Sequence, residues 1–200
     1  MEPVLVLLPG MDGTGELFAP FIAALGPEVS SVVVRYPDQP QGYASHEDAA
    51  RAALPEGKPF VVLGESFSGP VAISIAAASP PGLCGYILCS SFVSCPSSTL
   101  KLLRPLLGIW PPRRVPDFVA EYFLMGRFAS PPLRRLHAEV LSSVSSETLV
   151  ARLKAVAKVD VREKVAPQLS PVSIFAPRTT GPSPAPRQRL SRDLPRTRAS

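Results

Sequence analysis

The sequence predicts an α/β fold with a mostly parallel sheet, and two observations lead to this prediction. Short apolar runs such as PVLVLL at residues 3–8 are hydrophobic without alternation, which is typical of strands that helices cover on both faces. These runs alternate along the chain with helical stretches, as they do in consecutive βαβ units. With 46% hydrophobic and 18% charged residues, the 200-residue chain also has enough apolar surface for one buried core.

The expected elements follow one another in a regular order. Strands are predicted at residues 3–8, 31–35, 60–63, 86–89 and 171–176. Helices are predicted at residues 16–25, 45–54 and 70–78, and a capping box formed by Ser45 and Asp48 is expected to begin the second of them. From about residue 97 to residue 158 the pattern changes to amphipathic helical pieces with aromatic residues and prolines, which predicts an inserted helical lid.

The end of the chain differs from the rest. Residues 177–200 contain five prolines and six arginines but only two leucines, too little apolar surface to offset the entropy of ordering. We therefore expect one domain at residues 1–176 and a disordered tail at residues 177–200. The tail also carries the whole formal charge of +5, so the predicted domain is neutral, which argues against nucleic acid as a partner.

The cysteines and the first residues indicate the compartment. Cys84, Cys89 and Cys95 are odd in number and lack CxxC spacing, which argues against a disulfide framework and against a metal site. We expect buried thiols in a reducing cytoplasm. The apolar run at residues 3–8 is too short for a signal peptide or a membrane span, so we expect a cytoplasmic protein with no stable membrane insertion and no cofactor.

Two motifs at the ends of predicted strands carry chemistry. The first, LLPGMDGTG, places a glycine-rich loop after the strand at residues 3–8, and it lacks the GK[ST] of a phosphate-binding loop. The second, LGESFSG, places Ser66 between a predicted strand and a predicted helix. Its pattern is G-x-S-x-S, with Ser68 where the usual G-x-S-x-G motif has its second glycine, and serine is small enough for that position.

Together these motifs resemble the α/β-hydrolase superfamily, in particular its esterase and acyltransferase-like members with a PGxDGTG loop. The resemblance covers about residues 1–176 and implies an α/β-hydrolase fold with a helical lid. It implies that Ser66 is the nucleophile of an acyl-enzyme and that the backbone N–H groups of Met11 and Phe67 form the oxyanion hole. Asp12 is expected to cap its own loop by bonding nearby amides rather than to transfer protons.

The acid of the triad is not at its usual places in this sequence. It normally follows the strand predicted at residues 171–176, where the chain reads PRTT at residues 177–180. The alternative position, after the strand at residues 86–89, holds Ser90 and Ser91, which cannot stabilise an imidazolium. Elsewhere, Asp160 is expected to cap a short helix.

The base is also unassigned. No histidine follows His137, and His46 is expected to be solvated on a surface helix. His137 lies in the predicted lid and stays open as an unconventional base. The fold is accordingly expected to lack its last strand and helix, either because the reading frame changes near residue 177 or because the chain ends early, and the exposed sheet edge would favour self-association.

These observations support several functions. The leading hypothesis is a serine hydrolase that acts on a small carboxylic ester with an apolar acyl group, impaired here because the acid and the histidine are missing. One alternative is acyl transfer to an alcohol acceptor, and another is a catalytically dead α/β-hydrolase that binds a ligand or a partner protein. The segment KLLRPLLGIW at residues 101–110 adds a further alternative, contact with a membrane surface. The oligomeric state stays open.

Overall fold

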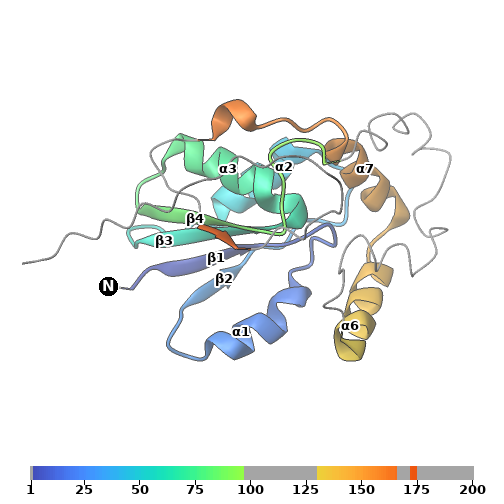
Figure 1. Cartoon of the computed structure of the whole chain (residues 1–200), viewed down its shortest axis with the longest axis horizontal. Helices are drawn as coiled ribbons and strands as arrows, with labels where there is room; N and C mark the ends of the chain where they lie inside the picture. The colour runs from blue at the N-terminus through green and yellow to red at the C-terminus, as the bar shows by residue number, and fades with distance from the viewer. Residues whose placement is uncertain (1, 97–129, 166–171, 175–200) are drawn as a thin grey trace, which may run out of the picture.

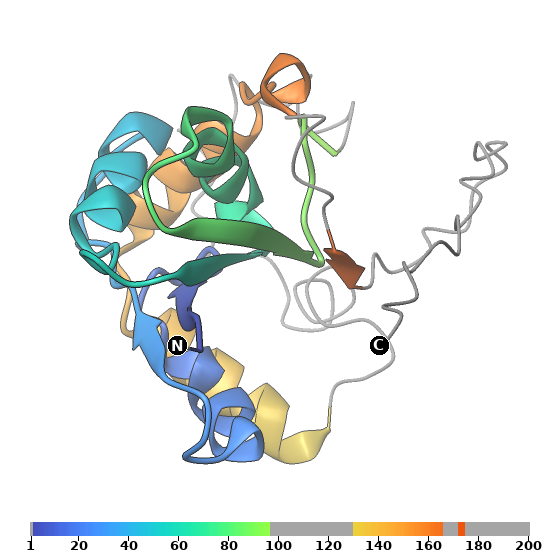
Figure 2. The same cartoon turned by 90° about the vertical axis from the view of Figure 1, so that its left-hand side faces the viewer.

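The computed structural model describes residues 2–96, 130–165 and 172–174, and its centre is a parallel sheet between two layers of helices (Figures 1 and 2). The strands are β1 (Val4–Leu8), β2 (Ser31–Val33), β3 (Phe60–Glu65), β4 (Leu83–Cys89) and β5 (Val172–Ile174). Their order in the sheet is β2-β1-β3-β4-β5, and every pair is parallel. The predicted α/β fold with a parallel sheet is confirmed.

The helices lie on both faces of this sheet and beyond its carboxyl end. They are η1 (Glu16–Phe18), α1 (Ala19–Leu25), α2 (Tyr43–Ala52), η2 (Ser66–Ser68), α3 (Gly69–Ala78), α6 (Pro131–Ser142), α7 (Ser146–Val156) and η6 (Arg162–Lys164). Figure 2 shows α1 on one face and α2 with α3 on the other. Helices α6 and α7 lie at the end of the sheet to which the strands point, and α6 contacts η1 (Figure 1).

The core is divided by the sheet because side chains alternate between its faces. Val6 and Leu8 of β1 are fully buried in the larger cluster, which faces α2 and α3. Leu7 lies between them in the sequence and belongs to the smaller cluster on the other face, together with Phe18 of η1. Helix α3 lies against the sheet and α2, and its residues from Gly69 to Ala76 are all buried, which explains why its sequence is apolar on every side.

Two expectations about local structure are wrong. The capping box of Ser45 and Asp48 does not begin α2, because the helix starts two residues earlier at Tyr43, with Gly42 as its N-cap and no side-chain cap. None of the three cysteines forms a disulfide within the described residues, but only Cys95 is buried, whereas Cys84 is exposed. An exposed thiol is available to solvent in a way that the sequence pattern did not indicate.

Part of the predicted organisation falls outside the described residues. Helices α6 and α7 lie within the range predicted for the lid, while residues 97–129, which include the KLLRPLLGIW segment, and residues 175–200 are not described. The domain and tail boundaries therefore stay predictions. Among the described helices, none has the length and hydropathy needed to cross a membrane. Over the same residues, no group of three metal-binding side chains comes together.

Candidate active site

The serine turn, residues 64–69, joins β3 to α3 at the carboxyl end of the sheet. Ser66 has a φ of 45°, in the left-handed region that residues with a side chain rarely adopt. Such strain costs about 1–3 kcal/mol and persists only where the surrounding structure enforces it. Part of that enforcement comes from Ser91 after β4, whose hydroxyl donates a 2.6 Å hydrogen bond to the carbonyl of Ser66.

Two glycines allow the chain to turn this sharply. A Cβ at Gly64 would lie 2.7 Å from the carbonyl oxygen of Ser68 and 2.9 Å from the Cβ of Ala72, so the end of β3 and the start of α3 approach each other too closely for a side chain. A Cβ at Gly69 would overlap the side chain of Ser91. The turn is therefore set by close packing on both sides of Ser66, against backbone at Gly64 and against the side chain of Ser91 at Gly69.

Ser68 forms hydrogen bonds to two other segments, in addition to having a side chain small enough for its position. Its side chain is fully buried, and its hydroxyl donates to the carbonyl of Pro9. Because a serine hydroxyl has one proton, the hydroxyl of Tyr36 must donate the 2.8 Å hydrogen bond that joins it to Ser68. Ser68 thus connects the serine turn to the end of β1 and to the segment after β2, a contact that a glycine at this position would not make.

Phe67 is fully buried behind Ser66 in a cluster of rings. The ring of Tyr43 stacks on it with centroids 4.7 Å apart, and the hydroxyl of Tyr43 donates to the carbonyl of Phe67 at 3.0 Å. The rings of Tyr36 and His46 contact it edge-on at 6.3 Å and 5.1 Å. This cluster holds the backbone of Phe67 in place at the amino end of α3.

His46 is fully buried, so the expectation of a solvated histidine is wrong. It lies on the inner face of α2, where its ring packs against those of Tyr36 and Phe67. Its Nδ1 is 2.6 Å from the carbonyl of Gly42, which requires a proton on Nδ1, and its Nε2 has no partner among the described residues. Burial lowers the pKa of His46, so it packs as a neutral ring.

The glycine loop, residues 9–15, follows β1 and lies beside the serine turn. It begins with a turn in which the N–H of Gly13 donates to the carbonyl of Gly10 at 3.1 Å. The peptide between Gly10 and Met11 is trans, so the N–H of Met11 points opposite to that carbonyl and out of the turn. No acceptor for this N–H group lies among the described residues.

Asp12 caps the glycine loop, as the sequence predicted. Its side chain is buried, and its carboxylate accepts from the N–H and the hydroxyl of Thr14 at 2.8 Å and 2.7 Å. These two bonds fix the second half of the loop. They use the carboxylate oxygen Oδ2 for loop structure rather than for proton transfer.

Arg152 is a site residue that sequence reasoning missed. Its side chain is completely buried although it projects from α7, and its Nη1 donates to the carbonyls of Met11 at 2.9 Å and Asp12 at 2.7 Å. Its Nη2 donates to the carbonyl of Pro37 at 3.0 Å, after β2. Burial lowers the pKa of this guanidinium, and the nearby carboxylates of Asp12 and Asp38 oppose that change. Helix α7, which lies in the range predicted for the lid, thus contacts the glycine loop directly.

The inward position of Arg152 can be inferred from the spacing of residues in α7. Thr148, Arg152 and Val156 are four residues apart and all buried, so they form the inner face of the helix. An arginine on that face needs acceptors, because a guanidinium is not buried without them. The sequence alone does not say which carbonyls accept, since they lie more than 100 residues away.

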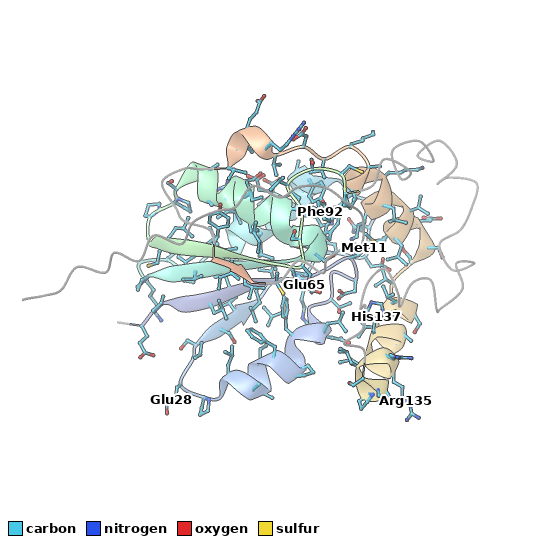
Figure 3. The ribbon with its side chains drawn as sticks, viewed as in Figure 1. Met11, Glu28, Glu65, Phe92, Arg135 and His137 are labelled. Carbon is cyan, nitrogen blue, oxygen red and sulfur yellow. The ribbon has the colours of Figure 1, made fainter. Side chains whose placement is uncertain are left out.

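Glu65 ends β3 directly before Ser66 and approaches the glycine loop from the side of the sheet. A Cβ at Gly10 would lie 3.1 Å from its Oε2. Burial, with a smaller contribution from the carboxylate of Asp12, raises the pKa of Glu65 to about 7, while hydrogen bonding from the backbone of Gly10 acts in the opposite direction. Figure 3 shows Glu65 and Met11 at the carboxyl end of the sheet, with Phe92 beyond β4.

The remaining candidates for the acid and the base are placed as follows. Ser90 and Ser91 follow β4, and Ser91 bonds the serine turn as described, so this position holds no carboxylate. His137 is partly buried on α6, the helix that contacts η1 (Figure 3). The position after β5 begins at residue 175 and lies outside the described residues.

Comparison with known proteins gives a likeness in structure only. No protein-family model and no curated protein matches the sequence. An esterase from Exiguobacterium antarcticum superposes with a TM-score of 0.66 at 13% identity, over 86% of this chain and 72% of the esterase. A hydrolase from Pseudomonas aeruginosa gives 0.63 at 18% identity, over 88% and 82% of the two chains. An alpha/beta hydrolase from a Medee basin deep-sea metagenome library gives 0.56 at 14% identity, over 81% and 66%.

Proposed function

The chain has the α/β-hydrolase fold, and from this premise we propose that it is a serine hydrolase that cleaves small carboxylic esters through an acyl-enzyme on Ser66. The observation that carries the proposal is the strained φ of 45° at Ser66, at the point where β3 passes into α3. Ser66 is half-buried at the carboxyl end of the sheet, and from such a turn a serine hydroxyl can reach a bound carbonyl group.

The reaction has two steps. The Oγ of Ser66 attacks the ester carbonyl carbon, and the tetrahedral oxyanion collapses to an acyl-serine while the alcohol leaves with one proton. Water then attacks the acyl-serine, which releases the carboxylic acid and restores the hydroxyl. The N–H groups of Met11 and Phe67 are the proposed donors to the oxyanion, and no cofactor is needed.

We further propose that the acyl group is apolar. Met11 and Phe92 are partly buried apolar side chains that follow β1 and β4 at the carboxyl end of the sheet (Figure 3). A hydrocarbon chain held beside them would be removed from water, at about 25 cal/mol for each Å² buried. Esters with longer acyl groups should therefore be preferred to acetates.

Turnover by these 200 residues is expected to be slow. The sequence has no carboxylate at either of the usual acid positions before residue 181 and no histidine after His137. Serine sites that lack triad members retain about 10³–10⁴ over the uncatalysed rate, from the oxyanion hole and substrate binding. The same observation favours a second candidate function, a catalytically dead hydrolase that binds an ester or a partner protein at this site.

A third possibility, acyl transfer to an alcohol, uses the same acyl-serine and differs in the acceptor. Adding an alcohol such as glycerol to the assay and identifying the product separates it from hydrolysis.

We also propose that the protein works in the cytoplasm. Cys84, Cys89 and Cys95 support this proposal, because an odd number of cysteines without a disulfide among them is typical of a reducing compartment.

Labelling with a serine-reactive fluorophosphonate and turnover of p-nitrophenyl esters test the proposal. Ser66→Ala should abolish labelling, while Ser142→Ala, at an exposed serine of α6, should label like the wild type. Labelling that persists in Ser66→Ala would reject the site. His137→Ala should leave the labelling rate unchanged unless His137 serves as an unconventional base. Labelling of Ser66 without turnover would favour the binding function.

A further inference from the structure

Among the described residues the N–H group of Met11 has no acceptor, and one backbone hydrogen bond, from the N–H of Gly13 to the carbonyl of Gly10, restrains the peptide that carries it. Gly13 and Gly15 have φ values of 72° and 76°, and with Gly10 they give the segment a large choice of backbone conformations. The bonds from Thr14 to Asp12 fix only the second half of the loop. The peptide that carries the N–H of Met11 lies in the first half.

We propose that Arg152 is a positioning residue for the oxyanion hole: from α7, its guanidinium holds the carbonyls of Met11 and Asp12 and so fixes the direction of the Met11 N–H. This inference rests on the proposed function of Ser66. It assigns to the lid a part in building the site, because α7 supplies the group that shapes the glycine loop.

The contacts fit this role in three ways. Nη1 bonds two successive carbonyls at 2.9 Å and 2.7 Å, so it constrains the peptide orientation on both sides of Asp12. The planar guanidinium donates from several fixed directions at once, which a lysine ammonium cannot reproduce. Gly13 leaves the space, since a Cβ there would lie 2.6 Å from both Nη atoms.

Arg152 is not the only attachment of α7 to the rest of the molecule. Asp38, after β2, accepts hydrogen bonds from the N–H of Ser145 at 3.1 Å and from its hydroxyl at 2.9 Å, at the start of α7. The helix also buries Leu149 and Val156. Because the helix has these other contacts, the effect of Arg152 on the loop can be separated from its effect on lid docking.

The experiment compares four variants. Arg152→Met keeps the apolar stem and removes the guanidinium, Arg152→Lys keeps the charge, and Arg135→Met makes the same change at an exposed position of α6. Asp38→Ala weakens the other attachment of α7. The rate of Ser66 labelling by a fluorophosphonate is measured with and without added guanidinium at concentrations that do not denature. Hydrogen exchange of the Gly13 amide is followed in the same samples.

We expect labelling of Arg152→Met to slow by at least about tenfold. Deleting one oxyanion donor lowers the rate by roughly 10²-fold or more, and a misplaced donor should lose a large part of the same stabilisation. Added guanidinium should restore part of the rate, and the Gly13 amide, which donates to the Gly10 carbonyl, should exchange faster. Arg152→Lys should label at a rate between those of Arg152→Met and the wild type. Arg135→Met should match the wild type in both measurements.

Several results would overturn the inference. One is wild-type labelling and amide exchange in Arg152→Met or, should that variant fail to fold, in Arg152→Lys. Another is an equal or larger loss of labelling in Asp38→Ala, since that would assign the effect to lid docking. If wild-type Ser66 does not label above Ser66→Ala, the proposed function fails instead, and the exchange measurement still shows whether Arg152 orders the loop.

Discussion

The serine turn and the glycine loop lie side by side at the end of the sheet, but they are held in different ways. The serine turn is fixed mainly by close backbone packing, with Gly64 against Ser68 and Ala72. The glycine loop is held from outside, by Arg152 of α7 on one side and by Glu65 of β3 on the other.

This difference predicts where each part is vulnerable. The serine turn should tolerate changes in α7 but not a methyl group added within the turn itself, because tightly packed backbone cannot move aside. The glycine loop should respond to distant substitutions and to pH, since charged groups hold it. The following predictions test this contrast, from the largest expected effect to the smallest.

Gly64→Ala should lower the free energy of unfolding by about 3 kcal/mol or more, because its Cβ meets backbone atoms. The nearest of these, the carbonyl oxygen of Ser68, would be 2.7 Å away and belongs to a turn that is fixed on both sides. Denaturant unfolding measures the change. Gly85→Ala is the matched control, since a Cβ there meets no atom of the described residues within 4 Å, and it should be neutral or slightly stabilising. Equal effects at the two glycines would refute the packing argument.

Glu65 should make the stability of the protein depend on pH. Its pKa of about 7 in the folded state lies above its ordinary value of 4.5, so folding favours the protonated carboxyl. The stability that this provides is fully present below about pH 4.5 and is lost as pH rises through about 7, by about 3 kcal/mol at most.

Glu65→Gln is the direct test, because glutamine stays neutral. The wild type should lose stability relative to Glu65→Gln between about pH 4.5 and about pH 7, as measured by denaturant unfolding at a series of pH values. Glu139→Gln, at an exposed position of α6, is the control for the same substitution away from the site. If the difference in the free energy of unfolding between wild type and Glu65→Gln did not change with pH, the carboxyl of Glu65 would titrate alike in the folded and unfolded states.

The same contrast explains which features could be predicted from the sequence. The strands, the helices and the strand-to-helix setting of Ser66 follow from local patterns of apolar residues and glycines, and the structure has them. The burial of His46 and the contacts of Arg152 depend on which distant segments meet. A single sequence contains the spacing that turns Arg152 inward, but not the identity of the carbonyls 115 or more residues away that receive it.

Ser68 is a residue whose role could be predicted from the sequence only in part. Its small size was predicted from the motif, while its bonds to Pro9 and Tyr36 were not, because they join residues 59 and 32 positions apart. Ser68→Ala should cost about 2 kcal/mol, since it leaves a buried carbonyl and a buried phenol without their partner. Tyr36→Phe should cost about 1 kcal/mol.

A double-mutant cycle separates the shared bond from the rest. The double variant should be less destabilised than the sum of the single variants by about 1 kcal/mol, because the bond between the two hydroxyls is lost only once. Denaturant unfolding of the four proteins gives the coupling energy. Strictly additive effects would mean that Ser68 and Tyr36 stabilise the turn independently.

Ser145 is the cap of α7 and should have the smallest effect. Its hydroxyl accepts the N–H of Thr148 at 3.3 Å and donates to Asp38 at 2.9 Å. Ser145→Ala should lower the free energy of unfolding by about 1 kcal/mol, the usual cost of losing such a cap. Ser146→Ala, at the next position, should change stability by less than about 0.5 kcal/mol, because it removes no cap.

Ser145→Ala also tests how far the two regions are independent. Arg152 lies four residues after Thr148, one helical turn inside α7, so loosening the start of this helix should weaken the hold on the glycine loop only slightly. Amide exchange in Gly13 should rise little, and exchange at the first turn of α3, next to the serine turn, should not change. The opposite result would be amide exchange that rises as much at the serine turn as in the glycine loop. That result would show that α7 holds both segments, and it would refute the contrast between local packing and distant contacts.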